Sequence, residues 1–151
     1  MKKFLLPFLL ILISNIALAQ SSKQVHWSYT AKKIADKTYE VHLTATINDG
    51  YHLYAQDFSG KALAATVFTF TKNPLTNFDG NVKEDGKAIK KFEAALNQDL
   101  KYYEKNVDFV QVVKLKGNAK TSLAGKVEFT VCNETHCLPP SEVEINVNIG
   151  G

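Results

Sequence analysis

Residues 39–47 read Tyr-Glu-Val-His-Leu-Thr-Ala-Thr-Ile, so apolar and polar side chains alternate without interruption. Successive side chains of a strand point to opposite faces, and this period of two predicts a strand with one buried face. The next three residues, Asn48-Asp49-Gly50, have the composition of a tight turn. The segment therefore predicts a half-buried strand that ends at a turn.

The same alternation recurs along most of the chain, with β-branched and aromatic residues at the apolar positions. The segments that show it are 25–30, 67–70, 109–115, 127–131 and 143–149. Turn-forming residues interrupt the pattern at 48–50, 73–74, 79–81, 117–118 and 139–140. Short strands separated by frequent turns predict an all-β fold, namely an immunoglobulin-like antiparallel β-sandwich.

Six aromatic residues of the predicted strands are expected in the core of the sandwich. They are Trp27, Tyr29, Phe68, Phe70, Phe109 and Phe129. Tyr102 and Tyr103 are adjacent, so in a strand they would face opposite sides. We expect one of the two in the core, while the other borders a functional site.

Residues 83–98 depart from the alternation, because charged residues surround isolated apolar ones. Ile89, Phe92 and Leu96 recur at spacings of three and four, which would suit a short helical turn. We interpret the stretch as a long excursion between strands, with a disordered tip as the alternative. Long loops in compact domains often carry function.

The N-terminus has the three parts of a secretory signal peptide. Lys2-Lys3 supplies the positive charge, residues 4–13 an apolar core, and residues 17–19 an Ala-Leu-Ala cleavage site. The apolar run is shorter than the ~20 residues that a membrane-spanning helix needs. We expect cleavage after Ala19, which leaves residues 20–151 as one soluble domain in the periplasm or otherwise outside the cytoplasm.

Composition and charge argue against some classes of function. Loss of Lys2 and Lys3 with the signal peptide lowers the formal net charge from +3 to +1, and the chain contains no arginine. Nucleic-acid binding is disfavoured, because phosphate recognition relies on arginine and on concentrated positive charge.

Both cysteines lie in the exported part, where disulfides persist. Two cysteines in a domain of this size are not a disulfide scaffold, so the core must carry the fold.

Those cysteines bracket four residues, in the segment Val-Cys-Asn-Glu-Thr-His-Cys-Leu-Pro-Pro at 131–140. A tight corner between two strands can bring Cys132 and Cys137 within disulfide distance. In the chain-entropy model, closing about six residues stabilises by only about 2 kcal/mol, which makes the pair a poor staple. A protonated His136 beside Cys137 can lower a thiol pKa. The residues alone leave a reactive and a structural disulfide equally open.

A copper or zinc site is a third interpretation, because Cys132, His136 and Cys137 all have metal-binding side chains. A closed zinc site needs four ligands, however. The other histidines, His26, His42 and His52, are single residues in strand patterns. We therefore expect no metal and no other cofactor.

Two segments resemble the N-terminal domain of the thiol:disulfide interchange protein DsbD, also called the disulfide bond corrector domain. One is the strand followed by Cys-x4-Cys-x-Pro-Pro that ends at Pro140, and the other is the segment Asn-Asp-Gly-Tyr-His-Leu-Tyr at 48–54. The resemblance covers essentially the whole exported chain. It implies an immunoglobulin-like fold and a thiol:disulfide oxidoreductase that relays electrons.

By this resemblance, Cys132 and Cys137 are the redox pair, while His52 and Tyr54 line the site beside them. The implied partners are a membrane thiol reductase and periplasmic thioredoxin-like or disulfide-bonded client proteins. The reductase supplies electrons, and the clients receive them. The family's cap loop shields the cysteines with an aromatic side chain. In this chain the resemblance implies Phe92 or Leu96 for that role.

Two departures from the family pattern matter. DsbD continues into a membrane domain and a thioredoxin-like domain, whereas this sequence ends at Gly151, so we expect a separate carrier. The acidic pair of the family's cap loop has no clear match, although Glu84, Asp85 and Glu93 are candidates. The alternative function is a non-enzymatic binding or adhesion sandwich of the cell envelope with a structural disulfide.

Overall fold

The computed structural model describes residues 23–57, 65–94 and 97–150, so the predicted signal peptide at 1–19 lies outside the described residues. Within them most residues lie in strands. These are β1 (Val25–Ala35), β2 (Thr38–Ile47), β3 (His52–Tyr54), β4 (Val67–Phe70), β5 (Thr76–Asp85), β6 (Ile89–Glu93), β7 (Gln98–Tyr103), β8 (Asn106–Leu115), β9 (Thr121–Phe129), β10 (Val131–Cys132) and β11 (Ser141–Ile149).

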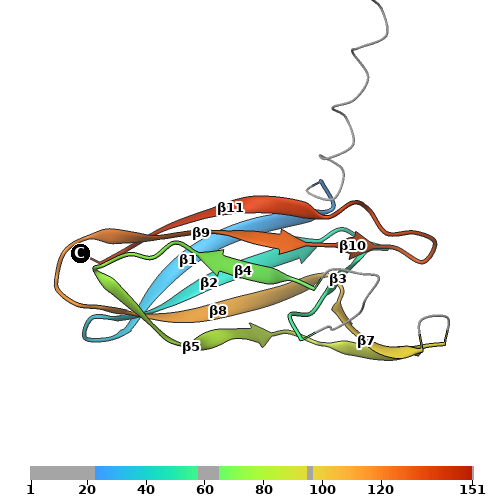
Figure 1. Ribbon diagram of the computed structural model, residues 1–151, viewed down its shortest axis with the longest axis horizontal. Helices are drawn as coiled ribbons and strands as arrows, with labels where there is room; N and C mark the ends of the chain where they lie inside the picture. The colour runs from blue at the N-terminus through green and yellow to red at the C-terminus, as the bar shows by residue number, and fades with distance from the viewer. Residues whose placement is uncertain (1–22, 58–64, 95–96, 151) are drawn as a thin grey trace, which may run out of the picture.

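The strands pair antiparallel in three sheets. One sheet has the order β1-β2-β8-β5, and a second has the order β11-β9-β4. Figure 1 shows these two sheets lying over one another along the length of the molecule. The predicted antiparallel β-sandwich is therefore confirmed.

Trp27 joins the two large sheets across the core. Its ring centroid lies 5.8 Å from that of Phe109 on β8 and 5.5 Å from that of Phe129 on β9. Phe68 on β4 meets Trp27 edge-on at 6.0 Å. Such aromatic pairs bury large apolar areas and prefer edge or tilted contacts. The core placement predicted for these aromatics is confirmed, with Tyr29, Phe68 and Phe70 packing on it while partly exposed.

A third sheet, which we call the end sheet, has the order β10-β3-β7-β6. Its strands continue from those of the sandwich: β2 leads into β3, β7 into β8, and β9 into β10. Figure 1 shows β3, β7 and β10 together at the end of the molecule opposite the C-terminus. The end sheet is thus held by direct chain continuity with the sandwich core.

The structure corrects the expectation for residues 83–98. Lys83–Asp85 belong to β5, and the predicted excursion continues as β6, which forms a hairpin with β7. The pairing runs from Ile89 opposite Tyr102 to Glu93 opposite Gln98. The spacing of apolar residues would suit a helical turn. Most β6 side chains are exposed, however, so the order of apolar and polar residues says little about the conformation of this segment. Backbone pairing with β7 therefore decides the conformation.

The turn predicted at 79–81 is instead a bulge inside β5. The pairing of β5 with β8 shifts register between Asp79 and Lys83, and Gly80 adopts a positive φ of 73°. A glycine in this conformation is typical of bulges, where it adds a residue without steric cost. The side-chain amide of Gln111 on β8 donates a hydrogen bond of 3.2 Å to the Gly80 carbonyl.

Gly125 on β9 provides a test of the packing of β9 against β4. It lies opposite Phe70, whose Cα would be 2.9 Å from a Cβ added at Gly125. We predict that Gly125→Ala lowers the free energy of unfolding by about 1–3 kcal/mol, because backbone would have to move. Urea unfolding followed by the fluorescence of Trp27 measures this loss.

Gly117→Ala is the matched control, because a Cβ there meets nothing within 4 Å. It should leave stability unchanged or raise it by less than about 1 kcal/mol. Equal midpoints for the two variants would contradict the tight approach of β4 to β9.

Candidate redox site

The two cysteines lie opposite one another in a short hairpin and are joined by a disulfide, with their Cα atoms 3.9 Å apart. The backbone N–H of Asn133 donates to the His136 carbonyl, and that of Leu138 donates to the Val131 carbonyl, each at 2.9 Å. These bonds flank the cysteines, which therefore occupy a non-hydrogen-bonded antiparallel position. Side chains approach most closely at such positions.

Asn133 closes the hairpin loop through its side chain. Its Oδ1 accepts hydrogen bonds from the backbone N–H groups of Thr135 and His136, both at 2.9 Å. The hydroxyl of Thr135 adds a third at 3.0 Å. Asparagine favours turns because it can make such local bonds. The loop geometry is thus held by hydrogen bonds as well as by the disulfide.

The two cysteines differ sharply in exposure. Cys132 is only 2% exposed and packs with Tyr54 and Leu100, whereas Cys137 is exposed at the edge of the hairpin. An incoming thiolate must reach a sulfur atom to attack it. The arrangement therefore favours attack at Cys137 and departure of Cys132.

A groove of about 850 Å³ runs beside the disulfide. The hairpin 132–137 forms one wall, and the turn and strand at 48–54 form another. Strands β6 and β7 and the turn after them supply the rest, including Lys91, Glu93, Leu100, Tyr102, Glu104 and Lys105. The groove is aromatic beside the cysteines and charged around its rim.

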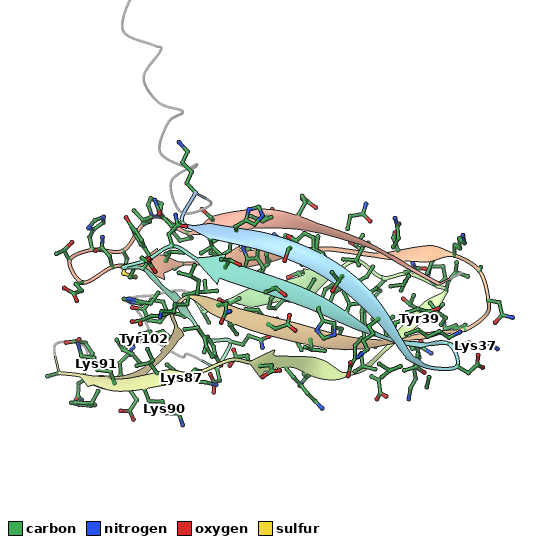
Figure 2. The ribbon with its side chains drawn as sticks, turned by 180° about the vertical axis from the view of Figure 1, so that it is seen from behind. Lys37, Tyr39, Lys87, Lys90, Lys91 and Tyr102 are labelled. Atoms are coloured by element: carbon green, nitrogen blue, oxygen red, sulfur yellow. A yellow bond between two sulfur atoms is a disulfide. The ribbon has the colours of Figure 1, made fainter. Side chains whose placement is uncertain are left out.

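Strand β7 has two chemically distinct faces, as alternation requires. Leu100 and Tyr102 line the groove, whereas Tyr103 is buried in the sandwich core. Figure 2 shows Tyr102 and Lys91 at the same end of the molecule, far from Lys37 and Tyr39. The expectation that one of the two adjacent tyrosines is core and the other borders the site is confirmed.

An ionic cluster on the opposite face of β7 fixes the strand against β5. The Glu84 carboxylate, whose side chain is 10% exposed, accepts from Lys101 Nζ at 2.9 Å and from the Tyr103 hydroxyl at 2.6 Å. It also accepts from the backbone N–H of Gln56 at 2.6 Å. The hydrogen bond from Lys101 to Glu84 raises the pKa of Lys101. Burial, and to a lesser extent its own hydrogen bond to Glu84, raises the pKa of Tyr103. Sequence patterns do not predict this cluster, although Glu84 is among the candidates for the acidic pair of the cap loop.

His52 lies directly opposite Cys132 in the pairing of β3 with β10. Its ring is 4.5 Å from that of Tyr102 between centroids, and its Nε2 is 3.4 Å from the Tyr54 hydroxyl. Burial lowers the pKa of His52 below its ordinary 6.5; Glu104 opposes this effect and Lys91 adds to it. Burial, with Tyr102 and Glu93, raises the pKa of Tyr54. The structure thus brings His52 and Tyr54 together with Cys132 in the groove.

The other predicted site residues have different positions. His136 lines the groove and is exposed, with its Nδ1 3.0 Å from the Thr135 hydroxyl. Phe92 does not line the groove and is 58% exposed, because Lys91 and Glu93 occupy the groove-facing positions of β6. The structure therefore does not support Phe92 as a shield over the disulfide. Leu96, the other predicted cap residue, lies outside the described residues.

The part of the chain that the structure describes contains no group of three His, Cys, Asp or Glu side chains that could hold a metal ion. Nor does any helix in this part have the length and apolar character needed to cross a membrane.

The family model for the N-terminal part of the thiol:disulfide interchange protein DsbD matches residues 20–149. This match supports thiol–disulfide oxidoreductase activity in general, and interaction with thiol–disulfide partners, in a family of periplasmic domains. No curated protein sequence matches the chain.

Two solved structures share the fold. The DsbD N-terminal domain of Neisseria meningitidis, in the reduced form, has a TM-score of 0.54 and 17% identity, over 86% of this chain and 89% of that chain. The N-terminal periplasmic domain of ScsB from Proteus mirabilis has a TM-score of 0.58 and 15% identity, over 82% of this chain and 45% of that chain. The likeness confirms the predicted immunoglobulin-like form of the sandwich.

The difference in exposure of the two cysteines predicts unequal reactivity after reduction. We expect iodoacetamide to modify Cys137 at least about tenfold faster than Cys132, because alkylation requires an accessible thiolate. Timed quenching followed by peptide mass spectrometry measures both rates in one sample. Equal rates would show that the hairpin opens on reduction. The same experiment in urea should remove the difference.

Proposed function

This chain belongs to the family of DsbD N-terminal domains, and we propose that its Cys132–Cys137 pair passes electrons between proteins by thiol–disulfide exchange. The observation that carries the proposal is a disulfide with one exposed and one buried cysteine at the edge of a groove. A purely structural disulfide needs no such groove beside an accessible sulfur.

In the reductive half of the cycle, a thiolate of the donor attacks Sγ of Cys137. The Cys132–Cys137 bond breaks, and Cys132 leaves with the electron pair while the donor and Cys137 form a mixed disulfide. The donor's second thiolate then attacks its own sulfur in the mixed disulfide. The donor becomes a disulfide, and the domain is left with two reduced cysteines.

In the oxidative half, the Cys137 thiolate attacks a disulfide of the client protein and forms a second mixed disulfide. The sulfur of Cys132 then attacks Cys137, which releases the client as a dithiol and restores the original bond. Two electrons pass from donor to client in each cycle. The short hairpin keeps Cys132 next to Cys137 throughout, so the resolving step is intramolecular.

We further propose that the donor is a membrane thiol reductase and that the clients are periplasmic thioredoxin-like or disulfide-bonded proteins. The proposal includes export, with cleavage after Ala19 and residues 20–151 as the working domain. Family membership supports this assignment, and so does the groove of about 850 Å³ beside Cys137. His52, Tyr54 and His136 line the contact region in this scheme.

The reduction potential tests the proposed exchange directly. We expect a value of roughly −180 to −270 mV for the Cys132–Cys137 couple, the range of proteins that exchange disulfides. Equilibration in graded dithiol–disulfide buffers, followed by alkylation and mass spectrometry, gives this value. A potential well below about −300 mV would identify a structural bond and favour the binding or adhesion sandwich.

Single-cysteine variants test the proposed order of attack. Cys132→Ala should accumulate a stable mixed disulfide with an oxidised thioredoxin-like client, because the resolving sulfur is missing. Cys137→Ala should accumulate far less, because its remaining thiol is buried. Non-reducing gel electrophoresis measures the adduct, with the double variant as the blank. Normal electron transfer by both single variants would overturn the relay.

A further inference from the structure

Reduction of the disulfide creates a chemical problem at Cys132. Cys132 leaves as a thiolate, yet it is 2% exposed and packs with Tyr54 and Leu100. A charge in an apolar site that water does not reach is costly unless it is neutralised or paired. In the opposite direction, the buried Cys132 thiol must lose its proton before it can attack Cys137. Breaking the disulfide therefore requires a proton donor next to Cys132, and re-forming it requires a proton acceptor there.

His52 occupies the position where such a group is needed. Residues directly opposite in an antiparallel pair have Cβ atoms about 4.5–5.5 Å apart and point to the same face. His52 holds this position relative to Cys132, and both line the groove. The imidazole is held by contact with Tyr102 on one side and by its Nε2 near the Tyr54 hydroxyl on the other.

We propose that His52 exchanges a proton with the sulfur of Cys132 each time the disulfide is broken or re-formed. This inference rests on the exchange activity proposed above and assigns a chemical role within it. The Tyr54 hydroxyl beside Nε2 can either donate or accept a hydrogen bond. It therefore suits both tautomers of the ring, and in the proposed exchange Nδ1 is the acceptor or donor of the proton.

The proton balance follows the electrons. When a donor thiolate breaks the disulfide, His52 takes up a proton from solvent through the groove and passes it to the departing Cys132 thiolate, which leaves the imidazole neutral. When Cys132 attacks the mixed disulfide at Cys137, its thiol proton passes to neutral His52, and the client sulfur leaves with the electron pair. His52 is partly exposed, so its protons can exchange with water.

The groups around His52 favour a neutral imidazole at neutral pH. The titratable or charged side chains that share its groove, besides the two cysteines, are Tyr51 and Tyr54 on either side of it in the chain, Tyr102 and Glu104 from β7 and its turn, Lys91 and Glu93 on β6, Lys105, Asp49, and Glu134 and His136 on the hairpin. Burial is the largest influence and lowers the pKa of His52. The proton acceptor is therefore present at pH 7 and is lost as the pH falls through that lowered pKa.

The resolving step can be isolated with an aromatic disulfide probe, 5,5′-dithiobis(2-nitrobenzoic acid). The reduced domain reacts at Cys137, and attack by Cys132 then releases a second coloured thiolate at a rate independent of probe concentration. We expect this rate in the wild type to level off across neutral pH and to fall only below the pKa of His52. Stopped-flow absorbance from about pH 5 to about pH 9 records the profile.

His52→Gln keeps hydrogen-bonding capacity but cannot accept the proton. Its resolving rate should be lower by on the order of 10²-fold at pH 7 and should rise about tenfold per pH unit, following the thiol itself. His26→Gln, on an exposed position of β1 that does not line the groove, is the matched control and should follow the wild type. His136→Gln tests the exposed imidazole next to Cys137 and should also keep the plateau.

A wild-type rate that rises tenfold per pH unit from pH 5 to pH 8 would overturn the role of His52 without the use of any variant. So would a His52→Gln profile equal to that of the wild type, or loss of the plateau in His136→Gln instead. Mixed-disulfide trapping by Cys132→Ala does not require His52. Failure of that trapping would reject the exchange function. If only the proton-transfer role of His52 is wrong, Cys132→Ala should still trap the mixed disulfide.

Discussion

The end sheet depends on one row of buried side chains that crosses three strands. Val131 on β10 lies opposite Leu53 on β3, and Leu53 lies opposite Tyr103 on β7. All three are at most 2% exposed and belong to the sandwich core. Because strand side chains alternate between faces, burying this row turns the neighbouring residues toward the groove. A slip of one residue in any strand would exchange core and groove residues, so burial of the row sets the register.

The chemistry of the site follows from that register. Cys132, His52 and Tyr102 each neighbour a member of the buried row, and they therefore share the opposite face. The Glu84 cluster strengthens the arrangement from behind, because it binds Lys101 and Tyr103 on the side of β7 that faces away from the disulfide. The core thus positions the groove without contributing any reactive group. It also buries Cys132, while the hairpin, which leaves the sheet, carries Cys137 into solvent.

The parts of this architecture that alternation and local motifs encode could be predicted from the sequence. The period of two in 39–47 and 127–131 predicts β2 and the end of β9. For the adjacent pair Tyr102–Tyr103, a strand would require one residue in the core and one at the site. The β6–β7 hairpin could not be predicted, because its side chains are largely exposed and its pairing depends on backbone hydrogen bonds. Only the family resemblance suggested Phe92 or Leu96 as a cap, and alternation along β6 places Lys91 and Glu93 on the groove side instead. The Glu84 cluster joins residues from β5, β7 and the segment after β3, which no local pattern connects.

In the proposed exchange the disulfide is broken in every cycle, so it must contribute little to the stability of its own site. Closing a loop of about six residues stabilises by only about 2 kcal/mol in the chain-entropy model. Two backbone hydrogen bonds flank the cysteines, and the Asn133 side chain holds the loop, so the hairpin has other restraints when the bond is open. The folded state instead depends on the aromatic core around Trp27 and on the buried row. The bond that reacts in the proposed cycle is thus separate from the contacts that stabilise the folded domain. The domain can therefore change redox state in that cycle while the groove keeps its shape.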